Sequence, residues 1–381
     1  MAVAVLLGLG AAWNGGNVGP VVATLSDDFD VSLTAIGLLS GTLFFAGAVA
    51  GTIFAQPLGE RVGVANGMRV ACALMGAGNV LFALGLGFAG LAVARVMVGV
   101  GLAVASVLGP VFARTVGGVR MAGAFGAAFQ LGIAGALAVG SLLEDGGIAW
   151  QVGFVISAFT GMAAFPFIPR QVDVDPPGAP HGGFLRAAFR SFEVFRLTML
   201  FIATLGVPLI VSAWLVHYLT TDGDIRLGLA GVLSFVLFGT SAAMRLAGAR
   251  SLARGGSPVV LAALIPLMAA VGLAAIGVDS ALPVAIPAVV AMGIGFAVPY
   301  AVIIVEVQRI FPDEPLAPLA FVMVWVCTVP LVATPLVGSA LDSGNGELAF
   351  IALGAFVAIA ALLNLRPADT PIGAPQEAPA P

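Results

Sequence analysis

The sequence predicts an all-α membrane protein in which twelve transmembrane helices form two six-helix bundles related by pseudo-two-fold symmetry. Three observations lead to this prediction: the composition, a succession of apolar segments separated by charged clusters, and an internal repeat. Of the 381 residues, 60% are hydrophobic and 9% are charged, and the mean hydropathy is +1.11. Because soluble domains carry about 25% charged residues, this chain cannot cover a water-facing surface, and lipid must be its main solvent.

The apolar segments have the length that a membrane span requires. A helix needs about 20 apolar residues to cross a bilayer. Cutting the sequence at its charged clusters leaves twelve such segments, at residues 3–25, 33–55, 67–88, 90–113, 121–143, 150–169, 197–220, 228–249, 258–278, 282–305, 316–340 and 348–365. The first lacks the basic region of a cleavable signal peptide. Several connections are very short, so neighbouring spans are expected to be antiparallel.

The signs of the charges between the spans predict an orientation. One set of connections carries Arg61, Arg69, Arg114, Arg120, Arg170, Arg186, Arg190, Arg196, Arg250, Arg254, Arg309 and Arg366. The opposite set carries Asp27, Asp28, Asp30, Glu144, Asp145, Asp222, Asp224, Asp279, Asp342 and Glu347, with Arg226 among them. By the positive-inside rule the Arg side is cytoplasmic. We therefore expect a multi-pass protein of the cytoplasmic membrane with both termini in the cytoplasm.

The longest connection divides the chain into two halves. Residues 170–196 are rich in Pro and Gly and then basic, and they predict a cytoplasmic linker between an N-terminal bundle, 1–169, and a C-terminal bundle, 197–366. The second part of the linker, Phe184–Phe195, is amphipathic and is expected to form a short helix on the membrane surface. Residues 367–381 are rich in Pro and Ala and predict a disordered cytoplasmic tail.

An internal repeat relates the two halves. The segment DFDVSLTAIGLLS at 28–40 recurs as DGDIRLGLAGVLS at 222–234, an offset of 194 residues. The same offset relates VGVGLAV at 98–104 to MGIGFAV at 292–298. Because the offset spans six predicted helices, both copies enter the membrane in the same direction, which is typical of parallel repeats about an axis along the membrane normal.

The acidic pair that opens this repeat does not predict a metal site. Calcium takes 6–8 oxygen ligands, and no other ligand-rich segment accompanies Asp28 and Asp30. We interpret them, with Ser32, as residues that cap the N-terminus of the second span. Their copies are Asp222 and Asp224, before the eighth span.

The inventory of reactive residues excludes several function classes. All 15 basic residues are Arg, so the Lys of a Walker-type ATPase and a Schiff-base Lys are both missing. Cys72 and Cys327 lie in apolar stretches and are interpreted as small core residues. No group of His, Asp, Glu or Cys gathers at one depth of the predicted membrane region. We therefore expect no enzyme activity, cofactor, metal ion or nucleic-acid partner.

The loop after the second predicted span resembles a family signature. It reads QPLGERVG, which is similar to the pattern Gly-x-Leu-x-Asp-Arg-x-Gly of the major facilitator superfamily. Leu58, Arg61 and Gly63 match the pattern, while Gln56 replaces the first Gly and Glu60 replaces Asp. The second half keeps a partial copy, SLARGG. The resemblance implies twelve helices in two related bundles.

Two further segments resemble motifs of the same family. RVMVGVG in the fourth span contains Arg95, Gly99 and Gly101 of an Arg-x-x-x-Gly-x-Gly pattern. LGIAGALAVG in the fifth span is similar to the Gly-Pro-x-x-Gly-Gly pattern of the family's antiporters. Gly135 and Gly140 match it, with Ala in place of Pro and Val in place of the first paired Gly.

Four polar residues in the first half are the main substrate-binding candidates. Trp13, Asn14 and Asn17 share one helical face, and the resemblance implies that the first span lines the central cavity. Helix–helix hydrogen bonding is the alternative role for the Asn residues. Arg95 is costly in a membrane, by about 2.5–3.5 kcal/mol on insertion scales. It either binds an anion or relays protons, or it bonds carbonyl groups of neighbouring helices.

Six further residues are weaker substrate-binding candidates. Histidine is the side chain whose unperturbed pKa lies nearest neutral pH, so His217 could couple protons, whereas aromatic residues near it also fit an interfacial belt. Core packing is the alternative for the others. The six candidates are Gln130, Trp214, His217, Tyr300, Trp325 and Thr328.

Charged residues at the Arg side predict a gate. Glu60, Arg61 and Gly63 would form it in the first half. In the second half, Glu306 is expected to pair with Arg250 or Arg254. An anion at a helix N-terminus contributes about 0.3–1 kcal/mol. An interaction of this size is weak enough to form and break each time the gate closes and opens.

These observations predict a secondary active transporter that works by alternating access and is coupled to protons. The solute is a hydrophobic compound for efflux or a small organic anion. The alternative is a membrane receptor or scaffold that keeps the fold without transport. In either case we expect a monomer in the lipid bilayer, with a small molecule as its ligand.

Overall fold

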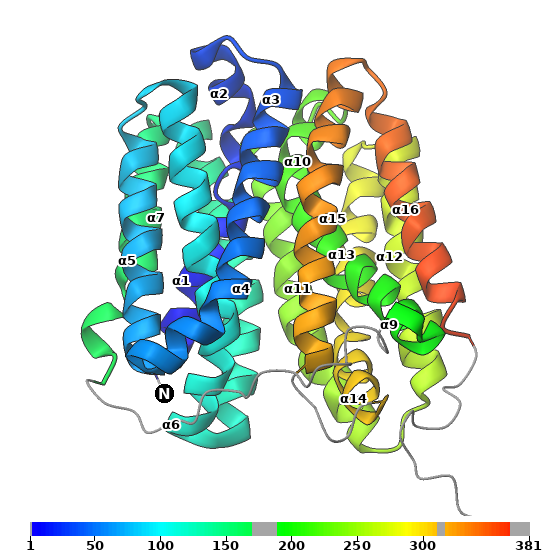
Figure 1. The fold of residues 1–381 in the computed structure, drawn as a ribbon. Helices are drawn as coiled ribbons and strands as arrows, with labels where there is room; N and C mark the ends of the chain where they lie inside the picture. The colour runs from blue at the N-terminus through cyan, green and yellow to red at the C-terminus, as the bar shows by residue number, and fades with distance from the viewer. Residues whose placement is uncertain (1, 170–188, 311–316, 366–381) are drawn as a thin grey trace, which may run out of the picture.

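In the computed structural model, residues 2–169, 189–310 and 317–365 are described, without the side chains of 117–120, 122–123, 308 and 317–320. Most of the predicted linker and the predicted tail lie outside these ranges. All regular structure in the described part is helical (Figure 1). The helices are α1 (Ala2–Gly16), α2 (Val22–Phe29), α3 (Leu33–Gly37), α4 (Phe44–Val62), α5 (Val64–Ala83), α6 (Gly87–Asp145), α7 (Trp150–Met162), α9 (Phe192–Phe201), α10 (Val207–Thr221), α11 (Leu227–Ala253), α12 (Pro266–Val278), α13 (Leu282–Ala297), α14 (Tyr300–Ile310), α15 (Ala317–Asp342) and α16 (Gly346–Leu362).

Every predicted span contains helix, which confirms the all-α membrane class. Within the described ranges, nine helical segments are long and apolar enough to cross a membrane. They are Leu33–Val62, Gly87–Val116, Ala124–Asp145, Trp150–Phe167, Phe192–Thr221, Leu227–Ala253, Val260–Val278, Leu282–Val307 and Phe321–Asp342. The seventh span begins at Phe192, inside the predicted linker, because Ser191 caps this helix by accepting a hydrogen bond from the Val194 amide.

Proline accounts for three of the interruptions inside the spans, whereas the π-helical turn Leu38–Leu43 in the second span has no Pro beside it. The first span breaks at the 3-10 turn Gly19–Val21, where Pro20 lacks the N–H that a continuous helix needs. Two π-helical turns, Ile202–Gly206 and Val260–Leu264, are each followed within two residues by a Pro at the start of the next helix. Because a Pro cannot donate to the carbonyl four residues earlier, the helix widens there.

The helix α6 supplies two spans. Gly109 and Phe125 would lie about 24 Å apart along a straight helix. A Cβ atom on Gly109 would instead lie 2.5 Å from the Phe125 ring. The axis of α6 therefore turns back between these residues, and its two parts pack as the fourth and fifth spans.

The internal repeat is visible in the backbone. Asp30 and Asp224 have φ angles of 50° and 48°, and they are the residues other than Gly with positive φ in the described part of the chain. They are 194 residues apart. Ser32 caps α3 as predicted, with its Oγ accepting a hydrogen bond from the Ala35 amide at 3.2 Å. Asp28 does not cap this helix, because its Oδ2 accepts a 2.7 Å hydrogen bond from Trp150 Nε1 and so holds α7.

The helices α1–α7 and α9–α16 lie in two groups that approach each other at one end and diverge toward the end where the N-terminus lies (Figure 1). We call these groups the first and second halves. Contacts of α6 with α11, and of α15 with α3 and α4, join them. The acidic end carries Asp28, Asp145, Asp222, Asp342 and Glu347, and the opposite, Arg-rich end carries Arg61, Arg69, Arg114, Arg250, Arg254 and Arg309.

Candidate functional site

Asp342, at the end of α15, joins the two halves at the acidic end. Its carboxylate accepts hydrogen bonds from the backbone amides of Leu33 and Thr34, each at 2.8 Å, and from the Thr34 hydroxyl at 2.6 Å. These amides belong to the first turn of α3, where no carbonyl within the helix can satisfy them. The positive end of the helix dipole adds to this attraction. The contact therefore caps α3 from the other half of the molecule.

An ion pair joins the halves at a second point of the same end. Arg226, before α11, lies 2.8 Å from Asp145 at the end of α6. The hydrogen bond to Asp145 and the negative charge of this carboxylate raise the pKa of Arg226. The Arg226 side chain is 78% exposed, so the pair contributes little stability. Its effect is to orient the start of α11 against α6.

Two symmetry-related glycines bring the halves into close contact. A Cβ atom on Gly37 would lie 2.6 Å from Pro335 Cα, and one on Gly231 would lie 2.4 Å from Ser141 Cβ. Gly37 and Gly231 are 194 residues apart, and so are Ser141 and Pro335. The repeat noticed in the sequence thus builds both interfaces between the halves, at α3–α15 and at α6–α11. The molecule is closed at its acidic end.

A cavity of about 280 Å³ lies between the halves. It extends toward the Arg-rich end, since Thr52, Ser106 and Pro110 all lie in the parts of their spans that face this end. Its lining is Ala12, Gly15, Phe44, Phe45, Ala48, Thr52, Leu102, Ala103, Ser106, Val107, Pro110, Phe125, Gly126, Phe129, Ile133, Leu205, Leu209, Arg245, Tyr300, Met323, Val326 and Cys327. The wall is therefore mostly apolar.

Arg245 is the charged residue in this lining, and our sequence analysis did not identify it. The guanidinium carbon of Arg245 lies 4.2 Å from the centre of the Tyr300 ring. Its Nε and Nη2 atoms are buried and have no hydrogen-bond partner in the described part of the structure. Its position inside the predicted span 228–249 was the available signal, because a cation in a membrane helix marks a functional group by default. Tyr300 was predicted as a cavity residue, and it does line the cavity.

The four main candidates of the first half belong to one hydrogen-bond network and do not line the cavity. Arg95 Nη1 donates to Asn17 Oδ1 at 3.2 Å, and both Nη atoms lie within 3.5 Å of the Asn14 carbonyl. Asn17 Nδ2 donates to Asn79 Oδ1 at 3.1 Å, and Asn79 donates to Asn14 Oδ1 at 2.6 Å. Trp13 belongs to the same network. These residues form a buried polar cluster inside the first half, which matches the structural alternative considered for them.

Ser157 in α7 completes this cluster. Its hydroxyl oxygen accepts hydrogen bonds from Trp13 Nε1 at 3.0 Å and from Asn17 Nδ2 at 3.2 Å. The cluster thus connects four spans, α1, α5, α6 and α7. The sequence analysis missed Asn79 and Ser157, because their partners become visible only when the packing of these helices is known.

The five remaining substrate candidates are scattered. Gln130 is buried in α6, and its Oε1 has no partner among the described residues. Trp214 Nε1 donates to the Thr334 carbonyl at 3.0 Å, and the His217 ring lies 6.3 Å from the Trp214 ring. Trp325 contacts other aromatic rings near the Arg-rich end, and the Thr328 hydroxyl donates within its own helix. None of the five is in the cavity lining.

The predicted gate of the first half lies at an exposed corner. Glu60 and Arg61 are exposed near the end of α4, and Glu60 Oε1 accepts a 3.0 Å hydrogen bond from Gln56 on the same helix. Gly63 separates α4 from α5 with a φ angle of 81°, in the left-handed region that favours Gly. The matching Gly of the family pattern therefore shapes the turn between these two spans, and the matching Arg61 lies exposed beside it.

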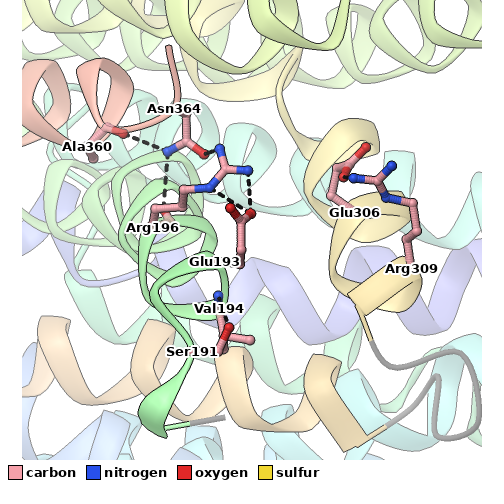
Figure 2. Close-up of polar contacts among 8 residues, drawn as sticks. All are labelled: Ser191, Glu193, Val194, Arg196, Glu306, Arg309, Ala360 and Asn364. Carbon is pink, nitrogen blue, oxygen red and sulfur yellow. Dashed lines mark hydrogen bonds and ion pairs between the residues drawn. The ribbon is translucent and has the colours of Figure 1, made fainter. Parts of the chain in front are cut away.

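The predicted pairing in the second half is wrong for this conformation. Glu306 forms a 2.9 Å ion pair with Arg309, one turn further along α14 (Figure 2), instead of pairing with Arg250 or Arg254. A partner three residues away on the same helix is always within reach. Arg250 and Arg254 lie in the last turn of α11 and just after it, and they line a shallow surface pocket with Ser251.

Figure 2 also shows a clasp at this end of the second half. Arg196 in α9 is buried, although the sequence placed it at the end of the predicted linker on the Arg side. Its Nε donates to Glu193 Oε2 at 2.9 Å and its Nη1 to Asn364 Oδ1 at 3.2 Å. Asn364 Nδ2 returns a 3.2 Å hydrogen bond to the Arg196 carbonyl. The clasp holds the start of α9 to the end of the twelfth span.

Replacing Asp342 with Ala is expected to weaken the closed acidic end by about 1 kcal/mol, because three hydrogen bonds to a charged group are lost at an exposed site. The apparent Tm of the purified protein should fall. Ser343→Ala is the matched control, since the Ser343 hydroxyl donates to carbonyls of α15 and accepts from the adjacent Asn345, so its printed hydrogen bonds stay within the second half. Equal Tm values for the two variants would contradict this role for Asp342.

This fold, with two related halves around an apolar cavity, is that of a membrane transporter. The chain belongs to the major facilitator superfamily, whose family model matches residues 4–317. No curated protein matches the sequence. The fold is similar to that of a D-xylose–proton symporter, with a TM-score of 0.73, 17% identity and coverage of 95% of this chain and 96% of that chain.

Two other solved structures have the same fold. A bacterial homologue of the human lysosomal transporter Spinster, in an inward-facing and unoccupied conformation, matches with a TM-score of 0.75 and 16% identity over 96% of this chain and 95% of that chain. The nucleoside transporter NupG matches with a TM-score of 0.76 and 12% identity over 95% of this chain and 98% of that chain.

Proposed function

We propose that this protein is a secondary active transporter that moves a small solute across the cytoplasmic membrane by alternating access. The observation that carries the proposal is the cavity between two halves that are held together at the acidic end. The positive-inside rule assigns the Arg-rich end and both termini to the cytoplasm. In this orientation the cavity faces the cytoplasm, and rocking of the halves would expose it to the other side.

The cavity wall favours a solute with a largely apolar body. Most of the lining is aliphatic or aromatic, and the hydroxyls of Thr52 and Ser106 donate to carbonyls of their own helices. A sugar would leave many of its hydroxyls without partners, which costs binding energy. The proposal therefore keeps two solute classes, a hydrophobic compound and a small organic anion.

Proton coupling is part of this proposal. Glu306 is a carboxylate in the tenth span with its side chain 16% exposed, and it forms an ion pair with Arg309, so we propose it as the residue that couples transport to protons. The fold is shared with a transporter described as a proton symporter. Glu306→Gln is expected to abolish the response of transport to a pH gradient.

The test is solute flux in proteoliposomes with an imposed pH gradient. A panel of lipophilic fluorescent compounds and aryl carboxylates supplies the probes. The wild-type protein should give saturable, gradient-dependent flux, and Arg61→Ala should reduce it about tenfold (about 1.4 kcal/mol) without a change in Tm, because Arg61 would latch the Arg-rich end in the opposite conformation. Binding of a probe without flux under either polarity of the gradient would reject transport in favour of a receptor.

A further inference from the structure

We infer that the solute carries one negative charge and that Arg245 binds its anionic group while its apolar body fills the central cavity. The inference rests on the cavity of the proposed function and names the class of solute that it takes. It starts from Arg245, which lines the cavity in α11 and stacks on Tyr300 in α14.

Arg95 and Arg245 both lie inside spans and both stack on an aromatic ring. Arg95 and Arg245 each place the guanidinium 4.2 Å from the centre of an aromatic ring, Phe44 and Tyr300 respectively. Arg95 also donates to Asn17 and to the Asn14 carbonyl. Arg245 has the ring alone within the described residues, and a cation–π contact contributes about 2 kcal/mol even when desolvated. The Arg245 residue is half-buried, but its Nε and Nη2 atoms are covered and have no partner among the described residues. Because covered polar atoms are normally paired, we infer that their partner is supplied from outside the chain.

Two donor atoms of the Arg245 guanidinium have no hydrogen-bond partner among the described residues. The unpartnered atoms are Nε and Nη2, and these two form one edge of the planar guanidinium. This edge holds two parallel N–H groups in the fork geometry that matches a carboxylate. Both atoms are covered by neighbouring atoms, so an anion reaches them when the side chain turns toward the cavity, away from Tyr300. A bidentate pair with an oxyanion would replace the weaker contact with the ring.

The described lining of the cavity carries one positive charge, since it contains Arg245 and no Asp, Glu or His. A monoanion neutralises this charge, whereas a neutral solute leaves the cation unpaired and a dianion leaves one negative charge in an apolar site. The cavity, at about 280 Å³, is near the lower end of the range for ligand pockets. Together these properties select a small lipophilic monoanion such as an aryl carboxylate.

The experiment compares two probes of equal shape, 2-naphthoate and its neutral amide 2-naphthamide, in equilibrium binding to the purified full-length protein. The wild-type protein should bind the carboxylate at least tenfold more tightly than the amide. Arg245→Gln should remove this preference, and Arg245→Lys should retain part of it because Lys keeps the charge and loses the fork. Arg114→Gln is the control for overall charge, since Arg114 is exposed at the Arg-rich end and outside the cavity lining.

Equal binding of the two probes to the wild-type protein would overturn the inference, and this comparison needs no variant to fold. Survival of the preference in Arg245→Gln would also overturn it. Failure of this inference can be distinguished from failure of the proposed function. Arg245-dependent binding of naphthoate without flux would leave the anion site intact and reject transport. Flux of a neutral compound without any preference for the carboxylate would keep transport and reject the anion site.

Discussion

Replacing Arg95 with Met is expected to lower the free energy of unfolding by about 2 kcal/mol, the loss associated with hydrogen bonds to a charged group. Arg95 stabilises the break in the first span. The helix α1 ends at Gly16, and the carbonyl of Asn14, in its last turn, accepts from both Nη atoms of Arg95. Cations are favourable at this end of a helix. Without Arg95, this carbonyl and Asn17 Oδ1 lose their donor at a buried position.

The measurement is the apparent Tm together with the yield of monodisperse protein. Arg95→Lys should recover part of the loss, because an ammonium group keeps the charge and can bond one of the two acceptors. Arg245→Gln provides a matched comparison, since Arg245 is the other arginine within a span that stacks on a ring, and no hydrogen bond would be lost. A Tm for Arg95→Met as high as that of Arg245→Gln would show that the network does not support the fold.

The spans and the repeat could be predicted because hydropathy and the sign of charge are local properties of the sequence. The offset that relates Asp30 to Asp224 survives as a shared backbone conformation. What the sequence could not reveal is which helices become neighbours. Asn79 and Ser157 are ordinary polar residues until α5 and α7 pack beside α1 and close the network around Arg95.

The candidate site was predicted less well than the fold, for two physical reasons. Polar residues at the spacing of one helical face were expected to line the cavity, yet hydrogen bonding within the first half satisfies Asn14 and Asn17 away from it. Glu306 was expected to pair with Arg250 or Arg254 of another span, yet it pairs with Arg309, three residues away on its own helix. Arg245 could have been identified from the sequence, because an arginine between apolar turns of a span is costly wherever the helix lies.

Replacing Gly231 with Leu is expected to drive the molecule out of the closed acidic-end conformation and to abolish flux. A side chain at this position overlaps Ser141 across the α6–α11 interface, with a Cβ–Cβ distance of 2.4 Å. Overpacking costs about 1–3 kcal/mol. Since only the conformation with this interface closed bears that cost, its population relative to the alternative should fall about 5- to 150-fold.

The reactivity of a cysteine in the cavity reports the population of the conformation that is closed at the acidic end. Ser106→Cys, in a Cys327→Ala background, places a thiol in the lining toward the Arg-rich end, and the remaining Cys72 is fully buried. A membrane-impermeant maleimide should label this thiol from the Arg-rich side, and adding Gly231→Leu should reduce that labelling at least fivefold. Gly239→Leu is the control on the same helix, because a Cβ atom there meets only the ring of Phe235 at 3.6 Å.

Equal labelling in both variants would mean that the contact of Gly231 with Ser141 does not hold the acidic end closed. Reduced labelling in Gly231→Leu alone would show that the closed acidic end requires the close contact at Gly231, and its repeat partner Gly37 makes the equivalent contact at the α3–α15 interface.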